Sequence, residues 1–446
     1  MGFCGKQIVI FVRKKTVEKT GLILYNRYIR IKGEIIMRIA AVISEYNPFT
    51  LGHQYHIEQT RALTKADAVI AIMSGNFVQR GEPAIFDKQL RTRLALEGGA
   101  DVVLELPTLF ALQTAEVFAY GGTRILDRLG CVDYLSFGSE SDISFLGRIA
   151  ALLADEPYSF KKELNRNLEE KIPFAQARSN TIAAYFNLTE EEKLALSMPN
   201  SILAIEYIKK LIQYDSDIQP IAIQRVGGGY NDESEYTDYL SATAVRKLIN
   251  DGNYPLLNQK LPEKIAKMIS AQTAKARDED FFPLMQYKMM TSGAEYIEGI
   301  SGVTEGLENL FAANAYAATY DELVENVHSK RYTRTAIKRM LYNILLGITK
   351  ADVEKCRRDD KCLYARVLGF RSESSGVVKY IADKASIPVI TNVPTYKKVL
   401  RDTTLFEYDI LASDVYKLVT GMPKKEGRPD FKLVPVMRGN DFPELT

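Results

Sequence analysis

Short apolar runs alternate with amphipathic segments in the first half of the chain. The runs at 38–44, 68–73, 101–106 and 134–137 predict buried strands, and helical patterns lie between them at 88–98 and 113–129. Apolar strands that alternate with helices are typical of a parallel sheet covered on both faces, so the sequence predicts a doubly wound α/β domain. Ligands of such sheets bind beyond the carboxyl ends of the strands.

The pattern loosens over 150–255 and changes character after residue 256. A lysine-rich amphipathic helix is expected at 261–276, helical patterns dominate as far as residue 350, and a short strand is expected at 389–391. We therefore expect an α/β domain over 37–255, followed by a mainly helical region over 256–446.

Residues 1–36 precede the first buried strand and carry an excess of positive charge. They hold five Lys and three Arg against two Glu, a net charge of +6, whereas the whole chain has +2, which leaves −4 for residues 37–446. We interpret this segment as an N-terminal extension, which an upstream start codon in the gene model would explain; the alternative is a genuine hairpin with a strand at 21–25. A nucleic-acid partner would have to bind a local basic patch.

Cysteine usage and hydropathy argue against a disulfide-rich, zinc-binding or membrane-spanning protein. The four cysteines (Cys4, Cys131, Cys356 and Cys362) form no CxxC pair and stand apart from the histidines, which argues against a disulfide scaffold or a structural zinc site. The apolar run at 8–12 is too short for a signal peptide or a membrane span. We expect a cytoplasmic protein without a membrane partner, and no feature points to a protein partner.

The most informative segment follows the first strand. It runs from Ser44 to His56 and contains Thr50-Leu51-Gly52-His53, at the expected start of a helix. A helix N-terminus offers free backbone N–H groups and a partial positive charge, which favour phosphate. Gly52 would let the backbone approach a ligand closely, and His53 in the first turn could donate to a phosphate oxygen. Two of the three histidines of the chain, His53 and His56, lie in this segment, although His56 could simply be a packed side chain.

A second segment has the composition of a phosphate-binding helix start. Ser241 or Thr243 could cap a helix there, and Arg246 with Lys247 would lie on its first turns. Any capped surface helix can show such a pattern, so its weight comes from its pairing with the first segment.

The first segment resembles the HxGH/TxGH signature of the nucleotidyltransferase superfamily, and the second resembles its ISSTxxR motif. The resemblance implies that Thr50 and His53 contact ATP phosphates and stabilise the transition state at the α-phosphate. Thr50 stands where histidine is more frequent, which leaves one motif imidazole.

Further segments resemble one branch of that superfamily, the bacterial tRNA(Met) cytidine acetate ligases. They span most of residues 37–340 and include 45–49, 73–84, 105–107, 137–140, 199–203 and 330–333. The resemblance implies a nucleotidyltransferase-like ATP-binding catalytic domain over 37–255 and a tRNA-binding region over 256–446. It also implies further ATP contacts at Ile43, Ser44, Glu45, Tyr46, Asn47, Pro48, Phe49, Leu51, Gly52, Gln54, Tyr55, His56, Gly138, Asn200, Arg225, Ser241, Thr243 and Arg246. Ser201 stands where the family often has a second asparagine, which weakens the assignment of Asn200.

The implied reaction is a two-step ligation. Acetate attacks the α-phosphate of ATP to give acetyl-adenylate and pyrophosphate, and N4 of the wobble cytidine of elongator tRNA(Met) then takes the acetyl group and releases AMP. Adenylation needs positioning and charge stabilisation more than a protein nucleophile. The resemblance also implies that Mg²⁺ accompanies ATP, but the sequence identifies no metal ligands. Arg80, Lys88 and Arg91 are open candidates for binding the acetate carboxylate.

A basic segment provides candidates for RNA contact. Residues 330–350 contain no acidic side chain, and Arg331, Arg334 and Lys338 have the spacing of one helical face, next to Lys330 and Tyr332. Such a stripe is suited to phosphate-backbone binding; the alternative is a solvated charged face.

Two other functions stay open from the sequence. The first is a small-metabolite adenylyltransferase, against which the long C-terminal region argues. The second is a non-catalytic ATP-dependent RNA-binding protein, which the single motif histidine would permit.

Overall fold

The computed structural model describes residues 37–170, 172, 174–225, 239–329, 331–421 and 427–438. The N-terminal extension and Lys330 therefore lie outside the described residues. The strands are β1 (Ile39–Ser44), β2 (Ala68–Ser74), β3 (Phe77–Val78), β4 (Glu82–Pro83), β5 (Val102–Leu106), β6 (Tyr134–Ser139), β7 (Gln219–Gln224), β8 (Ala365–Arg371), β9 (Val389–Ile390) and β10 (Val436–Arg438).

The helices of the first half connect and cover these strands. They are α1 (Leu51–Thr64), α2 (Lys88–Glu97), α3 (Thr108–Ala111), α4 (Ala115–Leu129), α5 (Ile143–Asp155), α6 (Tyr158–Glu169), α7 (Phe174–Phe186), α8 (Glu190–Ser197), α9 (Pro199–Gln213) and α10 (Ala242–Asn250).

The second half is mainly helical, as expected. Its helices are α11 (Tyr254–Lys260), α12 (Glu263–Ser270), α13 (Asp278–Glu298), α14 (Leu307–Ala313), α15 (Tyr320–Val327), α16 (Arg334–Leu346), α17 (Lys350–Arg358), α18 (Ser375–Lys384), α19 (Tyr396–Val399), α20 (Thr404–Thr420) and α21 (Pro429–Lys432), with short 3-10 turns η1 (Asp360–Cys362), η2 (Ser372–Ser374) and η3 (Val393–Thr395).

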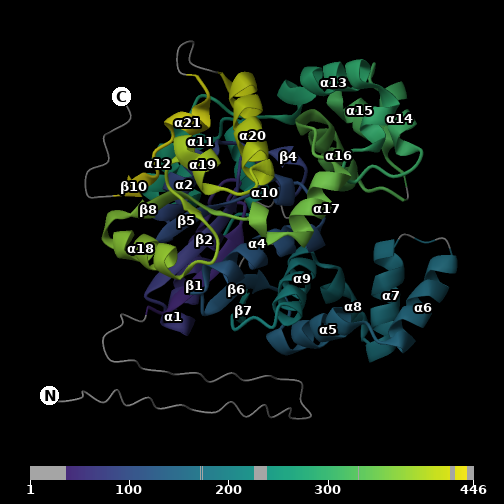
Figure 1. Ribbon diagram of the computed structural model, residues 1–446, viewed down its shortest axis with the longest axis horizontal. Helices are drawn as coiled ribbons and strands as arrows, with labels where there is room; N and C mark the ends of the chain where they lie inside the picture. The colour runs from purple at the N-terminus through teal and green to yellow at the C-terminus, as the bar shows by residue number, and fades with distance from the viewer. Residues whose placement is uncertain are drawn as a thin grey trace.

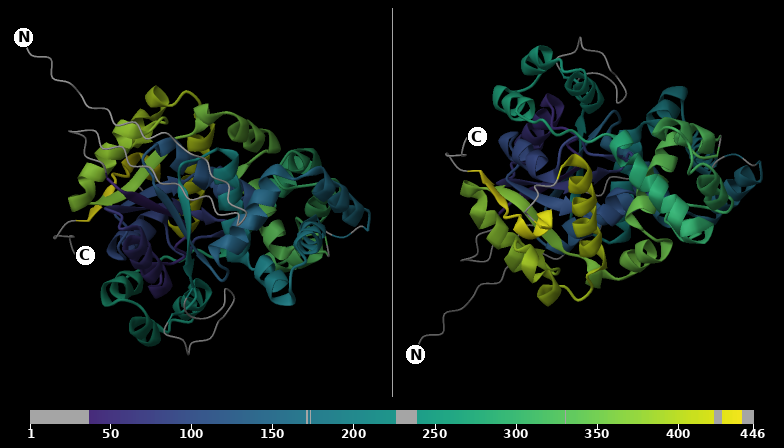
Figure 2. Two further views of the ribbon diagram at one scale, coloured as in Figure 1. Left: turned by 90° about the horizontal axis from the view of Figure 1, so that it is seen from below. Right: turned by 90° about the horizontal axis from the view of Figure 1, so that it is seen from above.

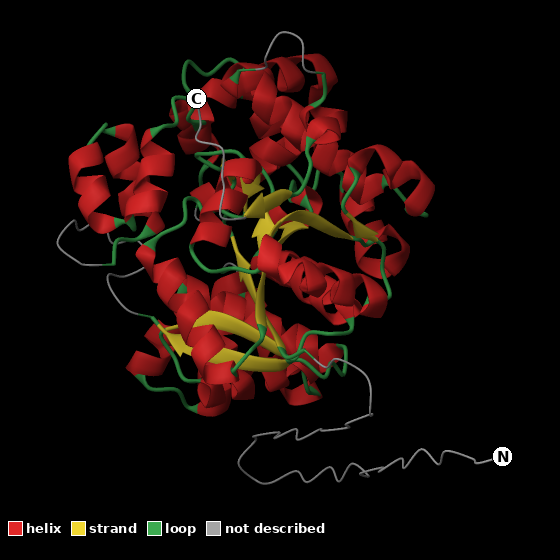
Figure 3. Cartoon of the chain, turned by 90° about the vertical axis from the view of Figure 1, so that its left-hand side faces the viewer, coloured by secondary structure: helices red, strands yellow, loops and turns green. Residues whose placement is uncertain are grey.

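One central sheet organises the molecule, with the strand order β10-β8-β5-β2-β1-β6-β7 and β9 beside β8. All its pairings are parallel except β5–β8. The sheet crosses the centre of the molecule between layers of helices (Figures 1 and 3). The predicted doubly wound α/β fold is thus confirmed, with one antiparallel pairing that the apolar pattern alone could not indicate.

Successive residues of β2 point into two different cores, as the strand geometry requires. Ile70 and Ile72 belong to one apolar cluster, which also includes residues of α4, α9 and α13–α16. Val69, Ala71 and Met73 belong to another, formed with residues of α1, α2 and α10–α12. Burial on both faces explains why the strand reads as a continuous apolar run.

The sheet takes strands from both sides of residue 255. β8 and β10 extend it beyond β5, so the last part of the chain returns to the first (Figure 1). The helices α13–α16 and α5–α8 lie at one end of the molecule, at the right of Figures 1 and 2. The predicted boundary at 255/256 stays a prediction, but the central sheet does not end there.

The helix expected at 261–276 is shorter than the pattern suggests. Pro262 is the N-cap of α12, and this helix ends at Ser270. The chain beyond it is held in a non-helical path because the backbone N–H of Ala276 donates to the carbonyl of Ile85 (3.1 Å) and Lys275 Nζ donates to the carbonyl of Ile249 (2.6 Å). Tertiary hydrogen bonds here override the helical pattern.

Two expectations from composition can be compared with the described part of the chain. Cys131, Cys356 and Cys362 are free thiols there. None of the helices in the described ranges combines the length and apolarity needed to cross a bilayer.

Candidate functional site

A cavity opens beyond the carboxyl ends of β1, β6 and β7. Its walls also include the starts of α1, α9 and α10, and it is lined by Ile43, Ser44, Thr50, Gly52, His53, Tyr55, His56, Arg80, Phe137, Gly138, Asn200, Leu203, Tyr207, Ile223, Gln224, Arg225, Tyr239, Leu240, Ser241, Ala242 and Thr243. This is the place where doubly wound sheets bind their ligands. The structure therefore brings both predicted motifs to one cavity.

The first helical turn of α1 forms the floor of the cavity. Thr50 is the N-cap residue, and the carbonyl of Thr50 accepts from the backbone N–H groups of His53 and Gln54 (both 3.1 Å). At Gly52, an added Cβ would meet only Thr50 Oγ1, at 3.6 Å. The fold itself would accommodate a side chain at this position, so the glycine keeps space open on the cavity side.

His53 is held as a neutral imidazole of one tautomer. The backbone N–H of Thr50 donates to His53 Nδ1 (3.0 Å), so this nitrogen is unprotonated. Burial lowers the pKa of His53 to about 3, helped by the nearby His56 and Arg225. The single ring proton is thus on Nε2, which makes His53 a hydrogen-bond donor toward the cavity.

The ring orientation of His53 is fixed by aromatic neighbours. Tyr46 and Phe49 approach it with centroid distances of 5.0 and 5.5 Å, and both are buried. This explains why two bulky aromatic residues belong to the loop before the motif: they pack around the imidazole and do not line the cavity.

His56 has a structural partner that also sets its tautomer. Thr60 Oγ1 donates to the carbonyl of His56 (2.7 Å), so the Ser136 hydroxyl must donate to Thr60 Oγ1 (2.7 Å). Ser136 Oγ then accepts from His56 Nε2 (2.9 Å). Burial, followed by Arg225, lowers the pKa of His56 to about 4. His56 is thus both a packed side chain and part of the cavity wall.

Glu140 joins two residues assigned by resemblance. Its Oε1 accepts from Asn200 Nδ2 (2.8 Å) and lies 3.3 Å from Arg225 Nε. Gly138 lies beside this group, and a Cβ there would come within 3.3 Å of Arg225 Cγ. Gly138, Asn200 and Arg225 therefore form one end of the cavity. Sequence reasoning missed the role of Glu140, although it belongs to the 137–140 segment that resembles the family.

The helix predicted from the second segment is confirmed as α10, and its binding of phosphate stays a prediction. Ser241 is its N-cap, and its Oγ accepts from the backbone N–H of Ala244 (3.0 Å). The hydroxyl of Thr243 accepts from Arg80 Nη1 (3.3 Å) and Arg246 Nη2 (3.4 Å). Since both arginines donate, the hydroxyl proton of Thr243 is available to an anion in the cavity.

The structure places the other predicted ATP contacts behind the cavity wall. Asn47 accepts from the backbone N–H of Ile85 (2.8 Å) and donates to Glu82 (3.2 Å), while Arg246 donates to the carbonyl of Asn47 (2.7 Å). These contacts shape the loop that carries the motif. The residues outside the lining are Glu45, Tyr46, Asn47, Pro48, Phe49, Leu51, Gln54 and Arg246, and their direct contact with ATP stays a prediction.

The three candidates for a carboxylate-binding cation have different surroundings. Arg91 is fully buried and donates to the carbonyls of Phe86 (3.0 Å) and Glu45 (2.6 Å). Lys88 is buried too, and Arg80 alone of the three lines the cavity.

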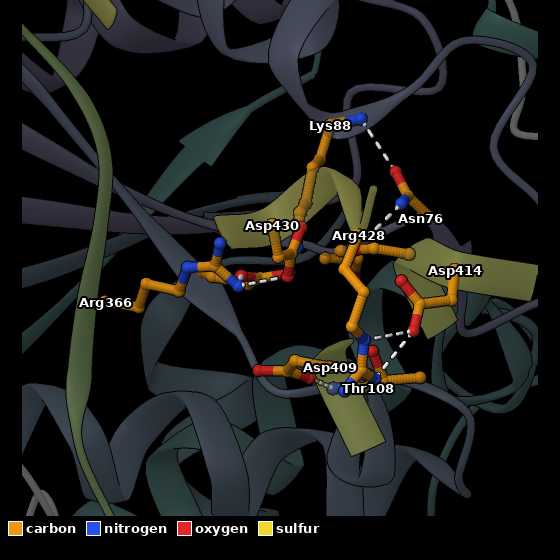
Figure 4. Close-up of polar contacts among 12 residues, drawn as sticks. Asn76, Lys88, Thr108, Arg366, Asp409, Asp414, Arg428 and Asp430 are labelled. Atoms are coloured by element: carbon orange, nitrogen blue, oxygen red, sulfur yellow. Dashed lines mark hydrogen bonds and ion pairs between the residues drawn. The ribbon is translucent and has the colours of Figure 1, made fainter. Parts of the chain in front are cut away.

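Lys88 belongs to a buried charge cluster outside the cavity lining. Its Nζ contacts Glu105 (2.7 Å) and Asp430 (3.0 Å), and Arg366 contacts the same two carboxylates (2.9 and 2.6 Å). Figure 4 shows Lys88, Arg366 and Asp430 in this cluster. Two cations balance two anions, so Lys88 has a structural role.

The predicted basic stripe needs a correction. α16 begins at Arg334 with Thr333 as its N-cap, so Arg331 precedes the helix and does not share its face. Arg334 pairs with Glu325 (2.5 Å), and Lys338 pairs with Asp278 (2.8 Å). Acidic residues distant in sequence thus neutralise part of the stripe. RNA contact by Lys330, Arg331, Arg334 and Lys338 stays a prediction.

Known proteins share both the sequence pattern and the fold. Residues 37–429 match the family model described as HIGH Nucleotidyl Transferase. The tRNA(Met) cytidine acetate ligase of Acetivibrio thermocellus is 38% identical over 393 residues, which cover 85% of this chain and 94% of the relative. That of a Thermoanaerobacter species is 40% identical over 388 residues, with coverages of 86% and 95%.

Solved structures extend the likeness to three dimensions. Thermotoga maritima TmcAL without ligand matches with a TM-score of 0.85, and the form bound with alpha-thio ATP with 0.83; each is 34% identical and covers 90% of this chain and 99% of the solved chain. The chain therefore belongs to the tRNA(Met) cytidine acetate ligase family, within the HIGH nucleotidyl transferases.

Proposed function

We propose that the protein is an ATP-dependent ligase that activates acetate as acetyl-adenylate and transfers the acetyl group to N4 of the wobble cytidine of elongator tRNA(Met). The observation that carries this proposal is the neutral His53 imidazole, which presents Nε2–H to a cavity at two helix N-termini. The relatives from Acetivibrio and Thermoanaerobacter carry the name of this activity, and one solved relative holds an ATP analogue.

In the first step, an oxygen of acetate attacks the α-phosphorus of ATP. A new P–O bond forms, the bond to the bridging oxygen breaks, and its electron pair leaves with pyrophosphate. His53 Nε2–H, the Thr50 hydroxyl and the free N–H groups at the start of α1 would stabilise the charge on the α-phosphate. A neutral donor can stabilise this charge by hydrogen bonding alone, and no proton has to be transferred in this step.

In the second step, the exocyclic amine of the cytidine attacks the acetyl carbon. The C–N bond forms, the amine loses a proton to water, and the bond to the adenylate oxygen breaks, with its electron pair leaving on AMP. The enzyme gains from adenylation because AMP is a far better leaving group than oxide. Positioning of the two substrates supplies much of the remaining acceleration.

Mg²⁺ would reach the site with the nucleotide. Within the described ranges, no group of three or more His, Cys, Asp or Glu side chains could hold a metal ion. The described side chains therefore do not form a metal site built by the protein alone, and a Mg²⁺ ion here would be held mainly through the nucleotide. ATP phosphates and water are the ligands that Mg²⁺ prefers.

The RNA partner would bind to the helical region at residues 256–446, where Arg331 and the α16 cations Arg334 and Lys338 would contact its phosphates. A protein with this substrate would act in the cytoplasm, where tRNA is found.

Transfer of labelled acetate tests the proposal. Purified protein, ATP and labelled acetate should acetylate elongator tRNA(Met), and initiator tRNA(Met) serves as the matched control. Nuclease digestion should place the label on cytidine at the wobble position. Adenylation of a small metabolite with no labelled tRNA would favour an adenylyltransferase, and tight tRNA binding without label would favour a non-catalytic RNA-binding protein.

A further inference from the structure

We propose that Arg80 is an additional catalytic residue, which binds the pyrophosphate part of ATP and stabilises it as it leaves. This inference deepens the proposed function and rests on it for the reaction. Arg80 belongs to neither nucleotide motif: it lies in the turn between β3 and β4, in a hairpin that follows β2.

The contacts of Arg80 place it at the phosphate-binding helix. Its side chain lines the cavity, and its Nη1 donates to Thr243 Oγ1 (3.3 Å) in the first turn of α10. Ala242 and Thr243 of that turn line the cavity too, and the free N–H groups of a helix N-terminus favour an anion. A guanidinium beside a helix N-terminus is a strong site for phosphate because it donates two parallel hydrogen bonds.

The layout of the cavity assigns this end to the leaving group. Gly138, Asn200 and Arg225 form the opposite end, at β6, α9 and β7, and the first turn of α1 with His53 lies between the two ends. If the α-phosphate is at His53 and the nucleoside at Gly138, the β- and γ-phosphates extend toward α10 and Arg80. In-line displacement requires the attacking carboxylate to approach from the side away from pyrophosphate. Arg80 is therefore better placed for the leaving group than for acetate.

The chemistry gives a cation at this position a direct effect on rate. When the bond between the α-phosphorus and the bridging oxygen breaks, its electron pair stays with pyrophosphate, whose negative charge increases. A positioned guanidinium stabilises this charge more in the transition state than in bound ATP.

The hairpin that carries Arg80 is held firmly. Arg339 of α16 donates from Nη1 to the carbonyl of Gln79 (3.2 Å), and the backbone N–H of Gln79 donates to Glu45 (2.6 Å). Gly81 has a φ of +74°, and a Cβ there would lie 2.4 Å from the backbone nitrogen of Arg339. The residues on both sides of Arg80, Gln79 and Gly81, are thus fixed by close contacts, which position the Arg80 backbone.

Binding of ATP and AMP by the full-length protein separates the pyrophosphate contact from every other role. We compare wild type with Arg80→Lys and Arg80→Ala, and use Arg166→Ala as a control because the Arg166 side chain is 74% exposed on α6. The affinity of Arg80→Ala for ATP should fall about 10- to 100-fold, the usual effect of losing a charge-assisted contact, while its affinity for AMP stays within about twofold. The affinity of Arg80→Lys for ATP should lie between those of wild type and Arg80→Ala, since lysine keeps the charge but not the paired donors.

Kinetics give a second, independent reading. In Arg80→Ala, the maximal rate of ATP–pyrophosphate exchange should fall and the KM for pyrophosphate should rise, while the KM for acetate and the transfer from supplied acetyl-adenylate to tRNA stay unchanged. Equal loss of ATP and AMP binding, or unchanged ATP binding, would overturn the proposal. A rise in the acetate KM alone would also overturn it and assign Arg80 to the carboxylate.

The two proposals can fail separately. If the wild-type protein shows no acetate-dependent exchange, the proposed function fails, whereas the difference between ATP and AMP binding still decides the role of Arg80. If exchange occurs and Arg80→Ala binds ATP like the wild type, only the inference about Arg80 fails.

Discussion

At the scale of single residues, the chemistry depends on which nitrogen of His53 carries the proton. The Thr50 N–H fixes Nδ1 as an acceptor, and burial keeps the ring neutral by lowering its pKa to about 3. An imidazole with an ordinary pKa would exchange protons near neutrality and would donate from either nitrogen. The environment thus converts a titrating side chain into a fixed donor.

The lowered pKa leads to a pH prediction. His53 is neutral at every pH above about 3, so it keeps its single donor throughout the neutral and mildly acidic range. The kcat/KM of adenylate formation for ATP, which reports groups of the ligand-free enzyme, should therefore show no inflection near pH 6.5 that depends on His53. Acetate-dependent ATP–pyrophosphate exchange between about pH 5.5 and 8 measures this. An inflection near pH 6.5 that disappears in His53→Gln would contradict the assignment.

At the scale of elements, the β3–β4 hairpin connects the nucleotide cavity with α16. Gly81 permits the close approach of the hairpin to α16, because a Cβ added at this position would meet the backbone of Lys338 and Arg339. The apolar pattern did not predict the hairpin, because two-residue strands carry no period. The long resemblance over 73–84 marked the segment, but only the structure shows which element it contacts.

Replacement of Gly81 by alanine should disturb this contact. The added Cβ forces the hairpin and α16 apart and strains a left-handed backbone, which should lower stability by about 1–3 kcal/mol and reduce the rate of adenylate formation about 10-fold. Gly252→Ala is the matched control, because Gly252 has a similar φ of +71° but open space around it. Urea unfolding and pyrophosphate exchange provide the two readings. Equal rates in the two variants would show that the contact does not position Arg80.

The start of α16 provides a test of the RNA prediction. Charge reversal at Arg331 and Arg334 should weaken tRNA binding and lower its salt dependence, because phosphate contacts release counterions. ATP affinity should stay unchanged, since neither residue lines the cavity. Glu325→Gln is an informative control: it frees Arg334 from its ion pair and should leave tRNA affinity equal or higher. Filter binding at two salt concentrations measures this, and unchanged affinity after charge reversal would exclude this surface.

At the scale of the whole molecule, the end of the chain is part of the catalytic fold. β8 and β10 join the sheet, and the buried Lys88–Glu105–Arg366–Asp430 cluster fastens α21 beneath α2 and β5. Nearby, the N–H of Thr108 donates to Asp409 of α20 (2.7 Å) (Figure 4). Segments from the end of the chain therefore belong to the same fold as the nucleotide cavity, so the chain is not divided into a catalytic first part and a helical second part.

Removal of one charge from this cluster should be costly. Asp430→Asn leaves Lys88 and Arg366 with only Glu105 within ion-pair distance among the described residues, in a buried environment, and should destabilise the protein by about 3–5 kcal/mol. Arg428→Ala removes a neighbouring pair with Asp414 whose arginine is 53% exposed, and should cost about 0–1 kcal/mol. Urea unfolding of both variants measures the difference. Equal midpoints would show that the buried cluster does not hold the C-terminal segment in place.

The sequence was informative where a pattern is local and less so where partners are distant. The strands β1, β2 and β5 were predictable because burial on both faces makes them predominantly apolar, and β6 was predictable from the short run at 134–137. The motif at Thr50–His53 was predictable from its spacing. The antiparallel β5–β8 pairing and the ion pairs of Arg334 and Lys338 depend on segments far apart in the chain. No local pattern encodes such contacts.

Acetate-dependent exchange of labelled pyrophosphate into ATP measures the catalytic role of His53, with wild type, His53→Gln and His53→Ala compared at neutral pH. Wild type should exchange only when acetate is present. His53→Ala should lose about 100- to 1000-fold of the rate, as expected for one lost transition-state donor, and His53→Gln should keep more activity because its amide can donate near the position of Nε2. Exchange without acetate, or an undiminished rate in folded His53→Ala, would contradict the account.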